Sequence, residues 1–150
     1  MSGKQENVGI FALELYFPKF YVDQTDLEKH DDCVGKYTIG LGLKEMAVCS
    51  TIEDPATLAL TVTRNLLKKY NIDPMQVGRI DVGTESLIDK SKSIKSVLMQ
   101  LFTENPDIEG ADSINACYGG TAALFNALHW CSSPFNHQNK YGNLRNNQVR

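Results

Sequence analysis

The sequence has 150 residues, of which 42% are hydrophobic and 22% charged, and its formal net charge is −3. This length and balance fit one globular domain that can bury a core. The small negative charge, without a basic stripe, gives no support for nucleic-acid binding. No apolar run is long enough to span a membrane, and residues 1–7 resemble neither a signal peptide nor a transit peptide. We therefore expect a cytosolic protein.

The cysteines and histidines do not follow a metal-binding pattern. The four cysteines are Cys33, Cys49, Cys117 and Cys131. They form no CxxC pair and no zinc-ligand spacing, and the three histidines are scattered along the chain. The sequence predicts no metal site, and in the cytosol we expect the thiols to stay reduced.

The first third of the chain predicts a strand, a short helix and a connector. Residues 8–17 are almost continuously apolar and predict a buried strand that ends before Pro18. Glu14 interrupts this run, which indicates either the strand end or a buried, paired carboxylate. Residues 23–30 predict a short acidic helix. Residues 35–42 form a glycine-punctuated connector whose spacing matches no phosphate-binding loop.

The middle of the chain continues this alternation of strands and helices. Residues 54–70 predict a helix, because an aspartate at the N-cap is followed by a proline and by one apolar face. A strand is predicted over 79–83, a helix over 93–102 and another short apolar strand over 111–114. The alternating order predicts an α/β layered fold.

The segment from Asn115 to Ala123 carries the strongest chemical signal. We expect Cys117 in the first turn of a helix, where unpaired backbone N–H groups and the helix dipole favour the thiolate, which is the nucleophilic form. The small residues that follow leave room for another backbone or a thioester. The alternative is that Cys117 acts as a small buried hydrophobe. The helix itself is apolar almost all round, so we expect it to be central and buried.

The last 19 residues differ in composition from the rest. Residues 132–150 are rich in asparagine, glutamine, lysine and arginine and show no periodicity, which predicts a disordered polar tail. We therefore divide the sequence into a folded part, residues 1–131, and a tail, residues 132–150.

Blocks of sequence running in order from Val8 to Trp130 resemble the eukaryotic 3-hydroxy-3-methylglutaryl-coenzyme A (HMG-CoA) synthase family. They are Val8-Gly9-Ile10 with Ala12-Leu13-Glu14, Tyr16-Phe17-Pro18, Tyr21-Val22-Asp23-Gln24, Gly35-Lys36-Tyr37-Thr38-Ile39-Gly40-Leu41-Gly42, Val82-Gly83-Thr84-Glu85, Ile88-Asp89-Lys90-Ser91-Lys92-Ser93, Asp107-Ile108-Glu109-Gly110 and Asn115-Ala116-Cys117-Tyr118-Gly119-Gly120-Thr121-Ala122-Ala123. The resemblance implies a thiolase-like layered fold, of which this sequence covers the N-terminal half.

The resemblance also implies a reaction and two catalytic residues. Family members transfer the acetyl group of acetyl-CoA to a cysteine, here Cys117. A glutamate, here Glu85, then acts as general acid/base, and the acetyl carbanion attacks acetoacetyl-CoA before water releases HMG-CoA. Both coenzyme A thioesters are substrates, no further cofactor is implied, and the family forms homodimers in the mevalonate and ketogenic pathways. Taken without the resemblance, a glutamate at the position of Glu85 is more often an ordinary surface acid at a strand end.

Two departures from the family pattern lead to alternative hypotheses. The loop that helps hold coenzyme A in the family is one residue shorter here and offers Cys33 and Val34, so we assign no substrate-binding residue. Family members are much longer, so we expect this chain to lack their catalytic histidine, a role we give to neither His129 nor His137, and to expose apolar faces of the Cys117 helix. The alternatives to an active synthase are a non-catalytic partner of a full-length synthase and a fragment without a stable fold.

Overall fold

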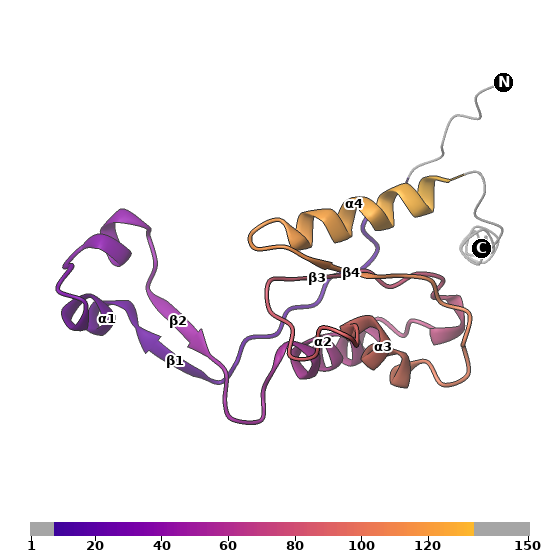
Figure 1. Cartoon of the computed structure of the whole chain (residues 1–150), viewed down its shortest axis with the longest axis horizontal. Helices are drawn as coiled ribbons and strands as arrows, with labels where there is room; N and C mark the ends of the chain where they lie inside the picture. Colours follow the sequence, from indigo (N-terminus) through magenta and orange to yellow (C-terminus); the bar gives the residue numbers. More distant parts are fainter. Residues whose placement is uncertain (1–7, 134–150) are drawn as a thin grey trace, which may run out of the picture.

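The structure is a computed structural model, and it describes residues 8–133. Figure 1 shows two parts, which we call the lobe and the body. The lobe projects to one side and contains β1 (Phe20–Asp23), α1 (Gln24–His30), the π-helical turn η1 (Lys36–Gly40) and β2 (Glu45–Val48). The body contains α2 (Pro55–Lys69), η2 (Pro74–Gln76), β3 (Val82–Thr84), α3 (Ile94–Leu98), η3 (Met99–Leu101), β4 (Asp112–Ile114) and α4 (Gly119–Ser132).

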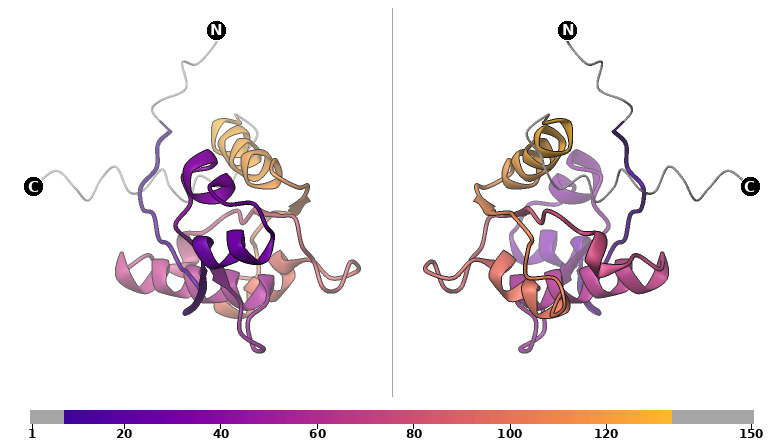
Figure 2. Two further views of the ribbon diagram at one scale, coloured as in Figure 1. Left: turned by 90° about the vertical axis from the view of Figure 1, so that its left-hand side faces the viewer. Right: turned by 90° about the vertical axis from the view of Figure 1, so that its right-hand side faces the viewer.

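The body has three layers. Strands β3 and β4 pair in parallel, with Gly83 opposite Ser113 and Thr84 opposite Ile114. Helix α4 packs on one face of this pair, while α2 and α3 lie together on the other, as the two directions of view in Figures 1 and 2 agree. This arrangement confirms the predicted α/β layering.

The core of the body is small and centres on α3. Among the described residues, the buried apolar side chains are Ile94, Leu98, Phe102, Ile108 and Ala123. The start of α3 is fixed from two sides, because Ser93 accepts from Ser96 N–H and the Asp112 carboxylate of β4 accepts from Lys95 N–H at 3.0 Å. Each large apolar side chain buried here contributes about 1.5–3 kcal/mol.

The helix start predicted from a capping residue, Asp54, is confirmed. Asp54 accepts from Thr57 N–H at 2.7 Å, and the Thr57 hydroxyl accepts from Asp54 N–H at 2.7 Å, which forms a capping box before Pro55. In the lobe, Asp23 caps α1 by accepting from Thr25 N–H at 2.8 Å. Polar side chains at these positions satisfy N–H groups that the helix itself leaves unpaired.

The predicted N-terminal strand is wrong for this structure. Residues 8–17 are extended but form no strand within the described chain, and Ile10 is 79% exposed. A buried strand needs neighbours at its edges and on its faces, and within residues 8–133 no strand pairs with this segment. The paired state of Glu14 is confirmed, because Lys69 lies 2.8 Å from its carboxylate and lowers its pKa, while Tyr70 donates to the Leu13 carbonyl at 2.9 Å.

The lobe contains a two-stranded antiparallel sheet that was not predicted, and its residues 35–42 are more ordered than the plain connector predicted there. Strands β1 and β2 pair antiparallel, with Phe20 opposite Val48. Beyond them, the buried carboxylate of Glu28 accepts from the backbone N–H groups of Gly35, Tyr37 and Thr38 at 2.8, 2.7 and 2.6 Å. These bonds, led by the one from Thr38, lower the pKa of Glu28 and fix the η1 turn.

Helix α4 is less buried than its composition predicts. Gly119 and Ala123 are buried against the sheet, but Leu124 and Phe125 are 50% and 48% exposed. The described residues cover only one side of the helix, so its outer apolar face is exposed to solvent, in line with the exposed apolar faces expected from the sequence.

No helix in the described part of the chain is long and apolar enough to cross a membrane. Most of the predicted tail, residues 134–150, lies outside the described residues, so the boundary at residue 132 stays a prediction.

Candidate active site

The parallel pairing of β3 and β4 brings the chain segments of Glu85 and Cys117 to one edge of the sheet. Asn115 N–H donates to the Thr84 carbonyl at 3.0 Å, so the pairing extends to the last residue of β3. Glu85 follows directly, and Cys117 lies two residues after Asn115. The carboxyl end of a parallel sheet is where α/β folds present their functional side chains.

Cys117 lies in a strained turn before α4 and not, as predicted, in the first helical turn. The turn is closed by Tyr118 N–H, which donates to the Ala116 carbonyl at 2.6 Å, and Cys117 has a left-handed φ of 55°. A non-glycine residue there costs about 1–3 kcal/mol, and such residues gather at functional sites. The cysteine is exposed, so the alternative of a small buried hydrophobe is wrong in this structure.

This turn connects a strand directly to a helix. Gly119 N–H donates to the Asn115 carbonyl at 2.8 Å, so α4 begins immediately after the turn. A sharp strand–turn–helix connection of this kind lifts the nucleophile of α/β-hydrolases out of the backbone. Here it presents a thiol beside the N-terminal end of α4, where the first helical N–H groups have no partner inside the helix.

Glu85 is exposed and lines an open cleft of about 620 Å³ on the α2 and α3 side of the body. Leu58, Ile88 and Ile94 supply apolar walls. Cys117 is not part of this lining, whereas Cys49, which follows β2, is. Sequence reasoning overlooked Cys49, because no spacing motif marks it. The two predicted residues thus follow neighbouring strands at the same sheet edge, but only Glu85 lines the cleft.

The far end of α4 is tied to the beginning of the sheet. Trp130 Nε1 donates to the Glu109 carboxylate at 2.8 Å, and Arg79 lies 3.6 Å from the same carboxylate. Arg79 also holds Asp81 with two hydrogen bonds, which raise the pKa of Arg79. Since Arg79 and Glu109 form a parallel bridge, these contacts fix the direction of α4 along the sheet.

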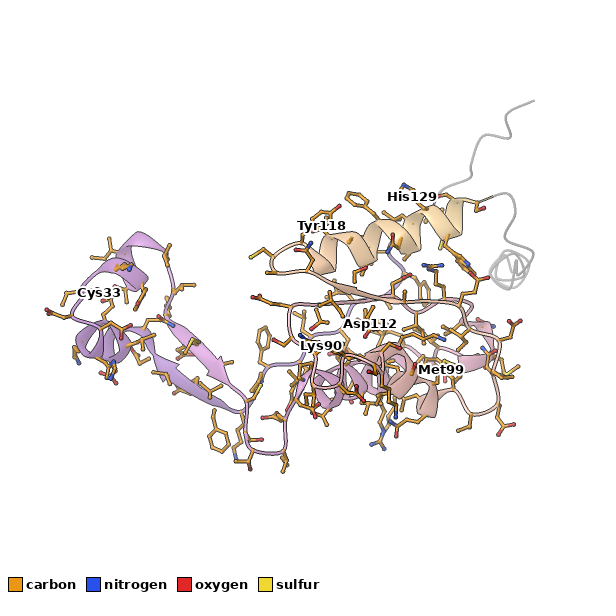
Figure 3. The ribbon with its side chains drawn as sticks, in the orientation of Figure 1. Cys33, Lys90, Met99, Asp112, Tyr118 and His129 are labelled. Carbon is orange, nitrogen blue, oxygen red and sulfur yellow. The ribbon has the colours of Figure 1, made fainter. Side chains whose placement is uncertain are left out.

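His129 and the lobe loop are not parts of this edge. Figure 3 shows Tyr118 near one end of α4 and His129 toward the other, where its ring stacks on Phe125 with centroids 6.5 Å apart. This agrees with a structural place for His129. Cys33 lies in the lobe and Val34 is 86% exposed, so no coenzyme A contact is assigned to either. Within residues 8–133, no group of three histidine, cysteine, aspartate or glutamate side chains could hold a metal ion.

Comparison with known proteins identifies the family. Residues 4–142 match the model described as hydroxymethylglutaryl-coenzyme A synthase N terminal. The chain belongs to the HMG-CoA synthase family. It is 60% identical over 134 residues to "Hydroxymethylglutaryl-CoA synthase ERG13" of Gibberella zeae, which covers 89% of this chain and 29% of that protein. It is 58% identical over 131 residues to the cytoplasmic HMG-CoA synthase of Gallus gallus, covering 85% of this chain and 25% of the relative.

A solved structure supports the same assignment at the level of the fold. "MvaS in complex with 3-hydroxy-3-methylglutaryl coenzyme A" superposes with a TM-score of 0.75 at 41% identity, over 81% of this chain and 29% of that one. The fold is thus α/β and corresponds to the N-terminal part of the thiolase-like synthase fold, as predicted. The chain spans less than a third of the length of these HMG-CoA synthases.

Proposed function

We propose that this chain carries the acyl-transfer site of an HMG-CoA synthase, with Cys117 as nucleophile and Glu85 as general acid/base. The observation that carries the proposal is the β3–β4 register, which brings both segments to one sheet edge. The family match and the HMG-CoA named with the similar MvaS structure support coenzyme A thioesters as substrates.

The proposed reaction begins with acetyl transfer. Cys117 Sγ attacks the thioester carbonyl of acetyl-CoA, the bond to the coenzyme A sulfur breaks, and coenzyme A leaves as the thiol with the proton from Cys117. The Gly119 N–H already donates to the Asn115 carbonyl, but a helix start leaves further N–H groups without an acceptor inside the helix, and groups of this kind are suited to stabilise the oxyanion that forms. The exposed thiol in its strained turn supports this step, because the substrate can approach without moving other side chains.

The second stage forms the carbon–carbon bond. Glu85 takes a proton from the acetyl methyl group, and the resulting carbanion attacks the ketone carbon of acetoacetyl-CoA, whose oxygen then receives a proton. Water hydrolyses the Cys117 thioester and releases HMG-CoA and the free thiol. The position of Glu85 in an open cleft supports access for this second thioester. The cytoplasmic name of the Gallus gallus relative supports a cytoplasmic location and a role in the mevalonate pathway.

The test is the intact mass of the purified chain after incubation with acetyl-CoA. We expect one acetyl group on the wild type and on Cys131→Ser, which changes an exposed thiol at the other end of α4, and none on Cys117→Ser. Glu85→Gln should still accept the acetyl group but lose exchange of the methyl protons with D₂O. An unmodified wild-type chain with a cooperative melt would overturn the proposal.

A second candidate function is association with another synthase chain. The exposed apolar residues Leu124 and Phe125 on α4 favour it, together with the exposed apolar side chains of residues 8–17. Exposed apolar surface larger than a few hundred Å² typically marks a protein interface. Light scattering of the chain alone and mixed with a full-length synthase tests it: a stable complex is expected, and a monodisperse monomer in both samples would contradict it.

A further inference from the structure

Strand β3 and the start of α4 meet backbone to backbone at Gly83. A Cβ atom placed on Gly83 would lie 2.4 Å from the Gly119 carbonyl oxygen and 2.4 Å from both N and Cα of Gly120. Ordinary van der Waals contact begins at 3.4 Å. The missing side chain is therefore what allows the helix to approach the strand this closely.

The contact is reciprocal. Gly119 is buried, and a Cβ atom there would lie 2.7 Å from the Ser113 carbonyl oxygen and 3.0 Å from Thr84 N and O. The start of α4 thus rests directly on the backbones of both β3 and β4. Because only backbone atoms make this contact, neither side can yield by a change of rotamer.

The two glycines stand at equal distances in sequence from the two proposed catalytic residues. Glu85 is two residues after Gly83, and Cys117 is two residues before Gly119. We infer that Gly83 is a positioning residue: its contact with the start of α4 sets the separation between the Glu85 carboxylate and the thioester on Cys117. The effect on catalysis rests on the proposed function. The effect on the separation of the two chain segments rests only on the close contact at Gly83.

Replacing Gly83 with alanine must move the strand and the helix apart by close to the 1.0 Å that separates 2.4 Å from 3.4 Å. A misplacement of about 1 Å can reduce the rate of a positioned reaction about 100-fold. Acetylation depends on the Cys117 turn and on the start of α4, which follow each other directly in the chain and are tied by the bond from Gly119 N–H to the Asn115 carbonyl. Removal of the methyl proton needs Glu85 and Cys117 together, so we expect that step to suffer most.

The adjacent glycine provides a matched control. A Cβ atom on Gly120 meets nothing within 4 Å, so Gly120→Ala adds the same methyl group to the same helical turn without separating the layers. We measure the rate of deuterium incorporation into the Cys117-bound acetyl group and divide it by the rate of acetylation, for G83A and G120A. The quotient is expected to fall about 100-fold in G83A alone. If G83A only reduced the fraction of folded chain, the rates of acetylation and of deuterium incorporation would fall together and their quotient would not change. Equal quotients in G83A and G120A would therefore overturn the inference.

A second readout does not depend on acetyl transfer. In a chain carrying E85C with Cys33, Cys49 and Cys131 changed to serine, the experiment measures the yield of the dibromobimane cross-link between residue 85 and Cys117. We expect G83A to lose most of this cross-link and G120A to keep it, and equal yields would overturn the inference even if acetyl-CoA never acylates the chain. If G83A shows no cooperative melt, G119A takes its place. A Cβ atom on Gly119 would lie 2.7 Å from its nearest neighbour, so we expect G119A to lose less of the cross-link than G83A would.

Discussion

The body is held together by buried apolar side chains, whereas the lobe is held by hydrogen bonds, both those of the β1–β2 pair and those to the carboxylate of Glu28. Among the described residues, the buried apolar side chains all belong to the body, and the buried residues of the lobe are Gln24 and Glu28. Glu28 binds three backbone N–H groups of the loop around η1. The stability of the body therefore depends on its apolar core, while the order of the loop around η1 depends on the protonation state of Glu28.

Truncating the core of the body should produce the largest effect. Leu98→Ala removes a buried side chain of α3, and we expect the free energy of unfolding to fall by about 2–5 kcal/mol, because it loses apolar contacts and leaves a cavity. Urea denaturation measures it. The matched control is Leu41→Ala at a lobe residue that is 64% exposed, which should change little. Equal losses in both variants would contradict the comparison.

Acid should loosen the lobe before the body. Hydrogen bonds lower the pKa of Glu28 from 4.5, so the stability it contributes is present above that value and is lost as the pH falls through the lowered pKa. Hydrogen exchange at Gly35, Tyr37 and Thr38, measured from pH 6 downward, should rise in this window after correction for intrinsic exchange, while α3 remains protected.

Glu28→Gln provides the control for this titration. Glutamine keeps the size of the side chain, but its NH₂ group cannot accept a hydrogen bond. Glu28→Gln therefore loses either the bond from Gly35 to Oε2 or the bonds from Tyr37 and Thr38 to Oε1. The amides that lose their acceptor should exchange quickly at every pH, without the acid-dependent step. A step that persists in Glu28→Gln would assign the pH dependence to another group.

Exchanging alanine for glycine should change stability in opposite directions at Cys117 and Cys131, because only Cys117 has a left-handed backbone. The effect should be smaller than those above. At Cys117, glycine relieves about 1–2 kcal/mol of left-handed strain and adds about 0.5–1 kcal/mol of chain entropy cost, so Cys117→Gly should be more stable than Cys117→Ala. Within α4, Cys131→Gly should be less stable than Cys131→Ala by about 1 kcal/mol. Melting temperatures of the four variants test the crossover, and the same order at both positions would contradict it.

A local capping signal predicted the start of α2. Asp54 and the proline that follows it marked this start, because a cap is satisfied by atoms only two or three residues away, whereas Ser93 was placed inside the predicted helix and was not recognised as its cap. Apolar runs were less reliable. The apolar composition of residues 8–17 and of α4 predicts burial. The sequence pattern does not say which residues would bury them, and within residues 8–133 much of this apolar surface is exposed.

The site was predicted in outline only. The resemblance supplied Glu85 and Cys117, whereas the parallel pairing that brings their segments to one sheet edge was not predicted and comes from the structure. The left-handed turn at Cys117 was not predictable, since cysteine has no preference for that conformation. The close contact of Gly83 had a usable signal, because a glycine inside a short strand often marks the approach of another backbone.

The most direct test of the central claim is peptide mapping of the acetyl group after brief incubation with acetyl-CoA. Cys49, Cys117 and Cys131 are all exposed, so exposure alone would spread the label among them. If the strained turn beside α4 forms the acyl-transfer site, the acetyl group should be found on Cys117 alone. A label on Cys49 in the Glu85 cleft, or one shared among the exposed cysteines, would contradict the account.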